Sequence, residues 1–432
     1  MKIAWFKTNI SPEIGCHLAG YSLNDISVAK LDDLFMTGLC MDDGERKVLL
    51  VSFDLIGLDE QYIKKNRKLC TEILHIPEHA VMLTPTHTHT GPESRSIGSR
   101  PEQIHRKYLD ELSVKLCDEV RGLTDFRECR VAFYSSYCDE NRNRRYVTAD
   151  NHTTFTPHRR EVVPIANGFA DKELGQLMFF DSKTHLPLYV IGNYAAHPLA
   201  GHSPGLGGLR ISADYPGAFR DYVTANTGAE CMFVSGAAGD MVPREDEQGE
   251  EAMRSMGIRL GKAAIAGLCD SARNPGRFMM ADAKVGSCIK SFTVPLRRRF
   301  ADGEQKSLPL EYRGLKEVTL EIQCLSIGDI CFVGVPGELC AELGQEIKWH
   351  SPFRRTFIAY DATAYFDYIA PANFLVSGGY EGCCQRFTAR SSLQLVNTAV
   401  DAMFALRESL YPSQGEPYPD GLLAPLVDIP KN

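Results

Sequence analysis

Short apolar runs alternate with longer segments of helical periodicity along most of the chain. Residues 48–53 (VLLVSF) and 81–83 (VML) have the continuous apolar pattern of buried strands. In segment 103–123 apolar residues recur every four positions and form one helical stripe: Ile104, Tyr108, Leu112, Leu116 and Val120. We expect further strands at 188–191, 232–234, 330–333 and 357–360, and further helices at 251–268, 338–349 and 391–408. The alternation predicts an α/β fold with a mixed β-sheet core flanked by helices.

The chain has 432 residues, of which 44% are hydrophobic, so it can bury a large core. This length would accommodate two or three domains, or one large α/β domain. No period of about 20–50 residues repeats, which excludes a solenoid or a propeller. Segment 411–432 contains five prolines and two glycines that interrupt any periodicity. We therefore expect one domain over residues 1–410 and an extended tail over 411–432.

The net charge of −8 argues against nucleic acid and anionic membranes as partners, because both bind clustered Lys and Arg. No stretch approaches the roughly 20 apolar residues needed to cross a bilayer. The first residues, MKIAWFK, lack the apolar core of a signal peptide, and the 14 cysteines include no CxxC pair. We expect a cytoplasmic protein with reduced thiols that acts on a small molecule. A homo-oligomer is compatible with the sequence.

Polar side chains that can bind metals follow several of the expected strands, where ligand sites of α/β sheets collect. Segment 86–92 (THTHTGP) follows the strand at 81–83, and an extended backbone would project His87 and His89 to the same side. Segment 193–198 (NYAAHP) places His197 after another strand. Two polar histidines at a strand end, or a lone structural histidine, would be the alternative to a metal or substrate site.

Two further segments have weaker signals. In 335–338 (VPGE) a strand leads into the expected helix at 338–349, and Glu338 would stand in its first turn, where the macrodipole favours glutamate whatever its function. Tyr368 and Tyr380 would be core residues by default. The chain contains no HExxH, GxxxxGK[ST] or GxGxxG motif, which disfavours a zincin, a P-loop NTPase and a dinucleotide enzyme. The letters GxSxG occur at 201–205 (GHSPG), but this polar stretch is expected to be a long loop and not the strand-turn-helix elbow of a serine hydrolase.

Taken together, the segments resemble the catalytic domain of the neutral/alkaline, non-lysosomal ceramidases. The resemblance covers most of residues 1–410 and rests on motifs in the order of that family: NISP (9–12), LAGY (18–21), THTHTGP (86–92), NRR (143–145), NYAAHP (193–198), SADYPG (212–217), GAAGD (236–240), VPGE (335–338), Tyr368 and YEG (380–382). It implies the fold of that catalytic domain and a zinc-dependent hydrolase that uses metal-activated water to cleave an amide.

The resemblance also implies roles for individual residues. The matching positions for the zinc ligands are His87, His197, Glu338 and Tyr368, and the spacing of 12 residues from Tyr368 to Tyr380 agrees with the family pattern. Two imidazoles, a carboxylate and a phenolate suit zinc with an open position for water. The matching catalytic positions are His89, Arg144 and Tyr380. Arg144 and Tyr380 would donate to an oxyanion, and His89 would orient the substrate or protonate the leaving amine.

The sequence departs from that family where its members have a serine near the substrate, because segment 239–243 (GDMVP) has Val242 there. Long ceramidases also have a C-terminal immunoglobulin-like domain, for which few residues remain here. We therefore expect a small, soluble, polar amide, or a related ester or lactone, rather than ceramide. Polar residues of 141–160 and of the loop after His197 would suit such a substrate if they line the cavity: Asn141, Arg142, Arg145, His158, Arg159, Arg160, His202 and Ser203.

Other readings remain open from the residues alone. A phosphoesterase, or a sugar lyase or isomerase, could use a similar metal site, and a phosphoesterase would usually bind two metals through several carboxylates. A non-catalytic protein that retains the fold is a further alternative, although it would not need all four ligand candidates and both oxyanion donors.

Overall fold

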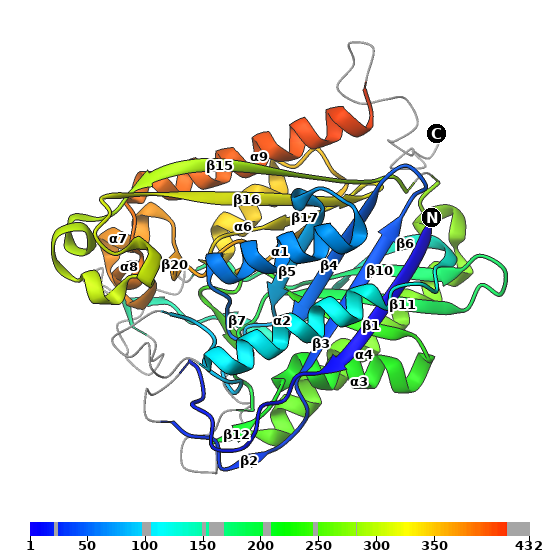
Figure 1. Cartoon of the computed structure of the whole chain (residues 1–432), viewed down its shortest axis with the longest axis horizontal. Helices are drawn as coiled ribbons and strands as arrows, with labels where there is room; N and C mark the ends of the chain where they lie inside the picture. The colour runs from blue at the N-terminus through cyan, green and yellow to red at the C-terminus, as the bar shows by residue number, and fades with distance from the viewer. Residues whose placement is uncertain are drawn as a thin grey trace.

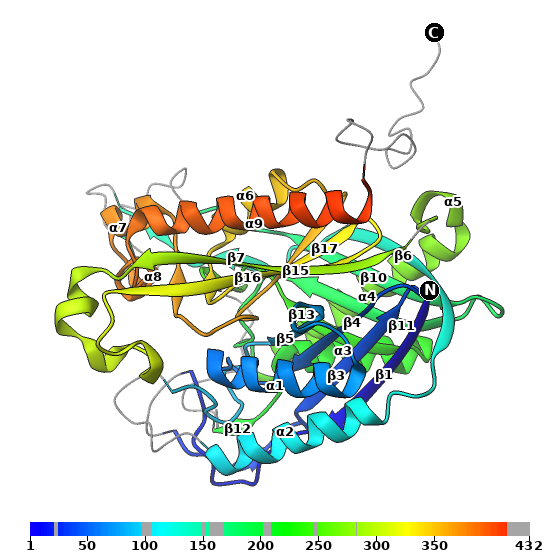
Figure 2. The same cartoon turned by 45° about the horizontal axis from the view of Figure 1, so that its top comes forward.

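The computed structural model describes residues 1–20, 25–96, 105–148, 153–154, 168–201, 209–244, 249–281 and 283–412. Two β-sheets pack face to face and helices cover their outer faces, so that the elements form four layers in the order helices, sheet, sheet, helices (Figures 1 and 2). The expected α/β fold with a mixed sheet core flanked by helices is confirmed.

The larger sheet has eight strands in the order β13-β11-β10-β6-β1-β3-β4-β5. Only its outermost pairs, β11 with β13 and β4 with β5, are parallel. β1 pairs with β3 along its whole length but with β6 through two residues, so the sheet consists of two halves joined at one end. The strand bounds are β1 Lys2–Asn9, β3 Phe35–Asp42, β4 Lys47–Phe53, β5 Val81–Pro85, β6 Arg127–Tyr137, β10 Glu173–Asp181, β11 Pro187–Tyr194 and β13 Glu230–Ser235.

The second sheet has four strands in the order β15-β16-β17-β19, and its last pair is parallel. The bounds are β15 Val285–Pro295, β16 Glu317–Ile327, β17 Ile330–Gly334 and β19 Arg355–Ala359. Four two-stranded ladders complete the strands of the described chain. They join β2 Ala29–Lys30 to β12 Arg210–Ile211, β7 Asn141–Asn143 to β14 Met241–Pro243, β8 Tyr146–Val147 to β9 Thr153–Thr154, and β18 Glu338–Leu339 to β20 Tyr368–Ile369.

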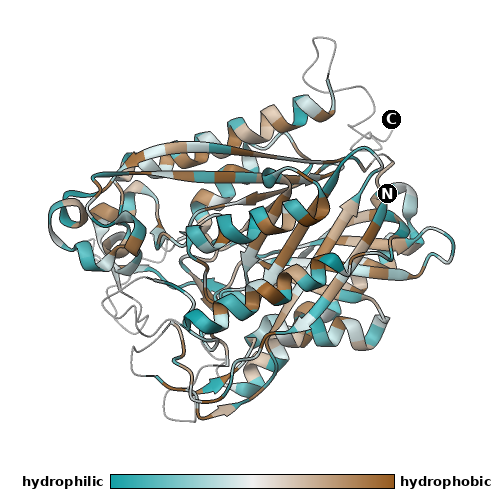
Figure 3. Cartoon of the chain, in the orientation of Figure 1, coloured by the Kyte–Doolittle hydropathy of each residue, from teal (hydrophilic) through white to brown (hydrophobic). Residues whose placement is uncertain are grey.

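Strand β4 shows why the sheets are sandwiched. Its side chains alternate between two apolar environments, with Val48 and Leu50 facing the second sheet and Leu49 and Val51 facing helices. Because neighbouring side chains of a strand point to opposite faces, a strand buried on both sides is apolar along most of its length, and the buried Ser52 of β4 donates to the Phe233 carbonyl at 2.7 Å. The continuous run at 48–53 is therefore what this position requires, and in Figure 3 the strands of the large sheet are predominantly brown.

Six helices pack on the sheets in three pairs. α1 and α2 pack on the half-sheet of β1, β3, β4 and β5, α3 and α4 pack on the half-sheet of β6, β10, β11 and β13, and α6 and α9 pack on the second sheet. The helix bounds are α1 Glu60–Leu74, α2 Arg106–Arg121, α3 Asp214–Thr227, α4 Glu250–Arg273, α5 Pro275–Phe278, α6 Ala341–Trp349, α7 Ala372–Ser377, α8 Tyr380–Cys384 and α9 Ala389–Leu410. Shorter turns are η1 Glu78–Ala80, η4 Arg299–Gly303, η5 Gln305–Ser307 and η6 Leu310–Tyr312.

Every strand expected from apolar runs is present, and the helices expected at 103–123, 251–268 and 391–408 correspond to α2, α4 and α9. The stripe on α2 is confirmed at Leu112, Leu116 and Val120, which are all buried. The helix expected from residue 338 begins only at Ala341, because Glu338 and Leu339 pair with β20 instead. Glu338 therefore lies in a short strand, and its placement in a helical first turn was wrong.

Among the described residues, no helix combines the length and the apolar composition that a bilayer crossing requires. None of the 14 cysteines, all of which lie in the described part of the chain, is paired in a disulfide. The predicted tail at 411–432 lies outside the described residues, except for Tyr411 and Pro412 at the end of α9.

Candidate metal centre

The three candidate histidines and Glu338 follow the carboxyl ends of strands from three parallel pairs: β4 with β5, β11 with β13, and β17 with β19. Hydrogen bonds join these ends. Ser235 Oγ, at the end of β13, donates to the carbonyl of Thr86 just after β5 at 2.6 Å, and the amide of Tyr360, just after β19, donates to the Ser235 carbonyl at 3.1 Å. The topology thus brings loops from distant parts of the sequence to one place.

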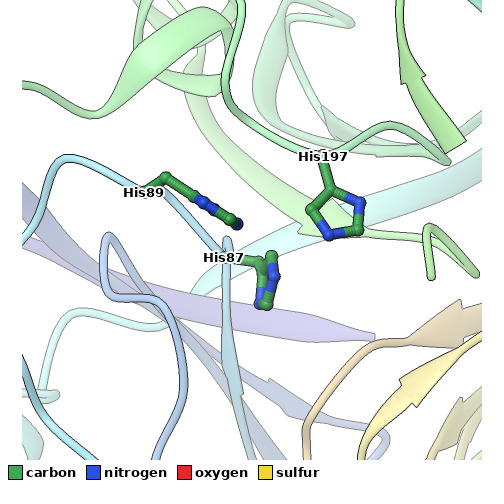
Figure 4. Close-up of side chains that lie close together, drawn as sticks. All are labelled: His87, His89 and His197. Carbon is green, nitrogen blue, oxygen red and sulfur yellow. The ribbon is translucent and has the colours of Figure 1, made fainter. Parts of the chain in front are cut away.

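Three buried histidines meet there (Figure 4). A ring nitrogen of each of His87, His89 and His197 lies within 4.8 Å of the others. The ring centroids are 5.1 Å apart for His87 and His89, 4.9 Å for His87 and His197, and 5.4 Å for His89 and His197. The backbone is not extended as expected, because His87 has φ 68° in the left-handed region. His87 and His89 nevertheless point into the same space.

Backbone carbonyls fix the protonation of two of these rings. His87 Nδ1 lies 2.7 Å from the Ile56 carbonyl, and His197 Nδ1 lies 2.6 Å from the Ala238 carbonyl. Because a carbonyl only accepts hydrogen bonds, each Nδ1 must carry the hydrogen, and each Nε2 of the neutral ring keeps its lone pair. His87 and His197 thus present nitrogen atoms with lone pairs that could bind a metal ion.

Glu338 brings a carboxylate oxygen to the same two atoms. Its Oε2 lies 3.6 Å from His87 Nε2 and 3.3 Å from His197 Nε2, and neither Nε2 atom forms a hydrogen bond within the described chain. Ligand atoms held about 2.0–2.1 Å from a tetrahedral zinc ion are about 3.3 Å apart. Two buried nitrogen atoms without a hydrogen bond and a carboxylate oxygen at this spacing fit a zinc ion between them.

The protonation states also suit a metal. Burial lowers the pKa of His87 and of His197 to about 4, which favours the neutral imidazole that acts as a ligand. Burial also lowers the pKa of His89, and the neighbouring His87 and His197 lower it further. Burial acts to raise the pKa of Glu338, but His87, His197 and a hydrogen bond from Tyr365 outweigh it, so the pKa lies well below the usual value.

Tyr368 lies next to Glu338 across the β18–β20 ladder, where the two residues are direct partners. Its side chain is 4% exposed, and its hydroxyl accepts a hydrogen bond from Arg144 Nη2 at 3.2 Å. Burial, and then the nearby Glu338, raise the pKa of Tyr368 well above its usual value. The described contacts therefore place Tyr368 beside the centre, and its assignment as a ligand stays a prediction.

Arg144 and Tyr380 border the same space. Arg144 Nε donates to Glu381 Oε1 at 2.7 Å, and its guanidinium carbon lies 5.5 Å from the ring centroids of both Tyr368 and Tyr380. Tyr380 is 48% exposed and its ring lies 5.2 Å from that of Tyr368. The structure thus brings the predicted oxyanion donors together, with Arg144 held in place and Tyr380 facing solvent in part.

Several of the expected rim residues have other roles. Asn141 donates to the Asp171 and Ala195 carbonyls, and buried Arg145 pairs with Glu381 at 2.8 Å. Arg142 is partly buried and donates to the Tyr146 hydroxyl. The remaining candidates, His158, Arg159, Arg160, His202 and Ser203, lie outside the described residues. Val242 lies in β14, where it is 8% exposed and pairs with β7.

The segment after β19 supplies side chains that sequence analysis missed. Asp361 Oδ2 lies 2.9 Å from His87 Nδ1, Tyr360 donates to Glu338 Oε2 at 3.1 Å, and Tyr365 donates to Glu338 Oε1. These residues contact the candidate ligands from outside, as such partners commonly do in metal sites. The sequence did contain a signal for these residues, because they are polar residues that follow an apolar strand, and the same pattern led to His87 and His197.

No protein-family model matches the chain, and no curated protein matches it. Among solved structures, the neutral ceramidase from Pseudomonas aeruginosa superposes with a TM-score of 0.75 and 17% sequence identity, over 94% of this chain and 74% of that chain. A ceramidase complexed with C2 gives a TM-score of 0.76 and 17% identity, over 94% of this chain and 75% of that chain. The chain therefore has the fold of these ceramidases, and the buried group of His87, His89 and His197 could hold a metal ion.

Proposed function

We propose that the protein is a zinc-dependent hydrolase that cleaves an amide bond of a small, polar substrate, with an ester or lactone as the nearest variant. The observation that carries this proposal is that His87 Nε2 and His197 Nε2 each lie within 3.6 Å of Glu338 Oε2 in a buried site. Tyr368 would complete the ligand set. A zinc ion bound there would polarise an acyl carbonyl and make hydroxide available from water near neutral pH.

The chain's own residues supply the remaining steps. Tyr380 and Arg144 would donate hydrogen bonds to the oxygen of the carbonyl as negative charge develops on it. Arg144 is oriented beside this space by Glu381 and the Gly239 carbonyl. His89 lies beside His87 and His197 and would accept the proton that water releases and pass it to the departing amine.

The amide class is carried over from the ceramidases that share the fold. The polar substrate is our own inference from the sequence, because this chain has net charge −8 and lacks the basic amphipathic segment expected of a protein that extracts lipid from a membrane. Val242 supports a different substrate as well, because the matching serine of the family lies near the bound substrate.

The decisive experiment combines metal analysis with a substrate panel. We expect about one zinc per chain, and hydrolysis of at least one compound among N-acyl amino acids, N-acyl sugars and simple lactones. His197→Ala should lose both, whereas Val242→Ala should keep both. Zinc content that is unchanged in His87→Ala and His197→Ala would refute the proposal. Two metals per chain with phosphate-ester cleavage would favour a phosphoesterase, and ceramide turnover at the rate of the best soluble compound would refute the substrate class.

A further inference from the structure

Tyr365 contacts two of the proposed ligands. Its hydroxyl donates to Glu338 Oε1, while the other carboxylate oxygen, Oε2, lies 3.3–3.6 Å from the two histidines, and the Tyr365 side chain is 4% exposed. Its ring also lies nearly parallel to the ring of His87, with centroids 6.4 Å apart and an interplanar angle of 15°. A buried carboxylate oxygen without a donor would be costly, so Tyr365 satisfies an atom that the metal would leave unpaired.

Arg95 determines the direction of the Tyr365 hydroxyl. Arg95 Nη1 donates to the Tyr365 oxygen at 2.8 Å, and its guanidinium carbon lies 4.6 Å from the centroid of the tyrosine ring. Because a guanidinium has donors and no acceptor, the phenol oxygen must accept this bond. The hydroxyl hydrogen of Tyr365 is then directed to Glu338.

Hydrogen bonds of Arg95 and of the residues next to it hold the arginine in this position. Glu93 accepts from Arg95 Nε at 2.8 Å and from Nη2 at 2.9 Å. Ser94 Oγ donates to the Gly57 carbonyl at 2.6 Å, and the Ser96 amide donates to the Asp59 carboxylate at 2.9 Å. At Gly57 itself, a Cβ atom would collide with the Tyr365 ring and would lie 3.2 Å from Arg95 Cδ. The tyrosine and the arginine are therefore part of a closely packed unit.

We propose that Tyr365 and Arg95 are positioning residues that hold the Glu338 carboxylate in its metal-binding orientation and so set the zinc affinity of the site. The inference rests on the proposed function for the identity of the ligands. With Oε1 bound to Tyr365, the carboxylate cannot rotate freely, and Oε2 stays directed toward His87 and His197. Arg95 acts through Tyr365, because it contacts the phenol oxygen and not the carboxylate.

The first test is the zinc affinity of Tyr365→Phe, measured by competition with a chromogenic chelator. Loss of a hydrogen bond to a metal ligand from outside commonly weakens binding by about 10–100-fold, and we expect a loss in this range. Tyr134→Phe is the matched control, because Tyr134 donates to the Asp270 carboxylate at 2.8 Å and joins β6 to α4. The control should bind zinc like the wild type. Equal affinities of Tyr365→Phe and wild type, or equal losses in both variants, would overturn the inference.

The second test asks whether Arg95 acts through Tyr365. The pair Glu93→Gln with Arg95→Met removes the cation without leaving a buried carboxylate unpaired, and it keeps the Tyr365 ring in case Tyr365→Phe fails to fold. We expect the double variant to bind zinc more weakly than the wild type. When it is combined with Tyr365→Phe, the zinc affinity should fall by less than about twofold below that of Tyr365→Phe alone. If the losses of zinc affinity in the double variant and in Tyr365→Phe multiply when the variants are combined, the proposed role of Arg95 is overturned.

The visible spectrum of the cobalt-substituted protein should change with Tyr365→Phe and not with Tyr134→Phe.

The wild-type protein separates this inference from the proposed function. If the wild type binds zinc through His87 and His197 and hydrolyses an acyl substrate, but Tyr365→Phe binds zinc equally well, only the inference fails. If the wild type binds no zinc, or His197→Ala keeps its zinc, both fail.

Discussion

Backbone conformation at single residues shapes the candidate metal centre. Six non-glycine residues of the described chain have positive φ, and three of them lie at or beside the centre: His87 at 68°, Asp361 at 49° and Asp367 at 61°. Histidine and aspartate tolerate this region better than most residues, because their short polar side chains can bond locally. The left-handed turn at His87 allows its Nδ1 to reach the Ile56 carbonyl. Sequence periodicity contains no signal for such a turn.

Tyr380→Phe should lower kcat by about 10²-fold, which is the usual cost of losing one oxyanion donor. Because Tyr380 is 48% exposed, the change should leave zinc content and the unfolding midpoint unchanged. Steady-state kinetics measures kcat, elemental analysis measures the zinc content, and thermal denaturation measures the unfolding midpoint. Tyr137→Phe is the control, since Tyr137 is 78% exposed at the end of β6. A Tyr380→Phe variant with normal kcat would remove Tyr380 from the catalytic residues.

Substitutions of the ligand candidates should separate binding from catalysis. We expect His87→Ala and His197→Ala to lose zinc, Tyr368→Phe to weaken zinc less than either, and His89→Ala to keep zinc while losing activity. The reason is that phenolate is the least usual ligand of the set, and that His89 is assigned to proton transfer. Elemental analysis after dialysis measures these contents. Since His89 lies within 4.8 Å of both other histidines, loss of zinc in His89→Ala would make it a ligand instead.

At the scale of elements, sequence patterns predicted what depends on local periodicity. The apolar run at 48–53 was sufficient to predict a strand, because burial on both faces leaves a continuous apolar pattern. The stripe on α2 was sufficient to predict a helix, because burial on one face leaves a pattern with the helical period. The two-residue ladder of β18 and β20 was missed, because it depends on a partner about 30 residues away and has no period of its own. Gly337 allows this pairing, since a Cβ there would lie 2.5 Å from the Asp367 carbonyl oxygen.

The hairpin of β15 and β16 carries turns that dock on the N-terminus of α1, where Tyr312 donates to Glu60. Burial, and then Asp59 and Glu60, raise the pKa of neighbouring Glu311 to about 7. A raised pKa means that the folded state binds this proton more tightly than the unfolded chain. The contribution of Glu311 to the stability of the folded state is therefore complete below the pKa of the unfolded chain, about 4.3, and is lost as the pH rises through 7.

We expect the free energy of unfolding to fall more steeply between pH 5 and pH 8 in the wild type than in Glu311→Gln, which resembles the protonated form. Denaturant unfolding at a series of pH values measures the difference. Taking the difference removes the contribution of groups that titrate in both proteins. Glu317→Gln is the control, since Glu317 is an exposed residue of the same hairpin. Parallel curves for wild type and Glu311→Gln would contradict the prediction.

At the scale of the molecule, the candidate centre depends on nearly the whole chain. The loops that form it follow strands between β4 and β19, and both sheets contribute. We propose that residues 1–410 form a single catalytic domain, because neither sheet could provide the centre alone. The side-chain types could be predicted from motifs, but their convergence follows from strand pairing. Asp361 and Tyr365 show the limit, because their roles depend on contacts with His87 and Glu338 that no local pattern records.

Calorimetry should show one cooperative unfolding transition, and zinc should shift the whole transition upward. Ligand binding to the folded state alone stabilises it by about 4 kcal/mol when free zinc is 1,000 times its dissociation constant. Scans with zinc and with a chelator measure this shift. His197→Ala should unfold at the same temperature in both. Two separate transitions, of which zinc moves only one, would contradict the single domain.

The order of the ligand candidates along the chain has a consequence for synthesis in the cell. About 250 residues separate His87 from Glu338, so a ribosome adding about 5–20 residues per second makes the carboxylate on the order of ten to fifty seconds after the first histidine. In the later part of that interval, once His197 has been made, both histidines are available without Glu338. A nascent chain would therefore complete the centre only after both sheets have been made, and zinc incorporation would report that the strands of both sheets have come together.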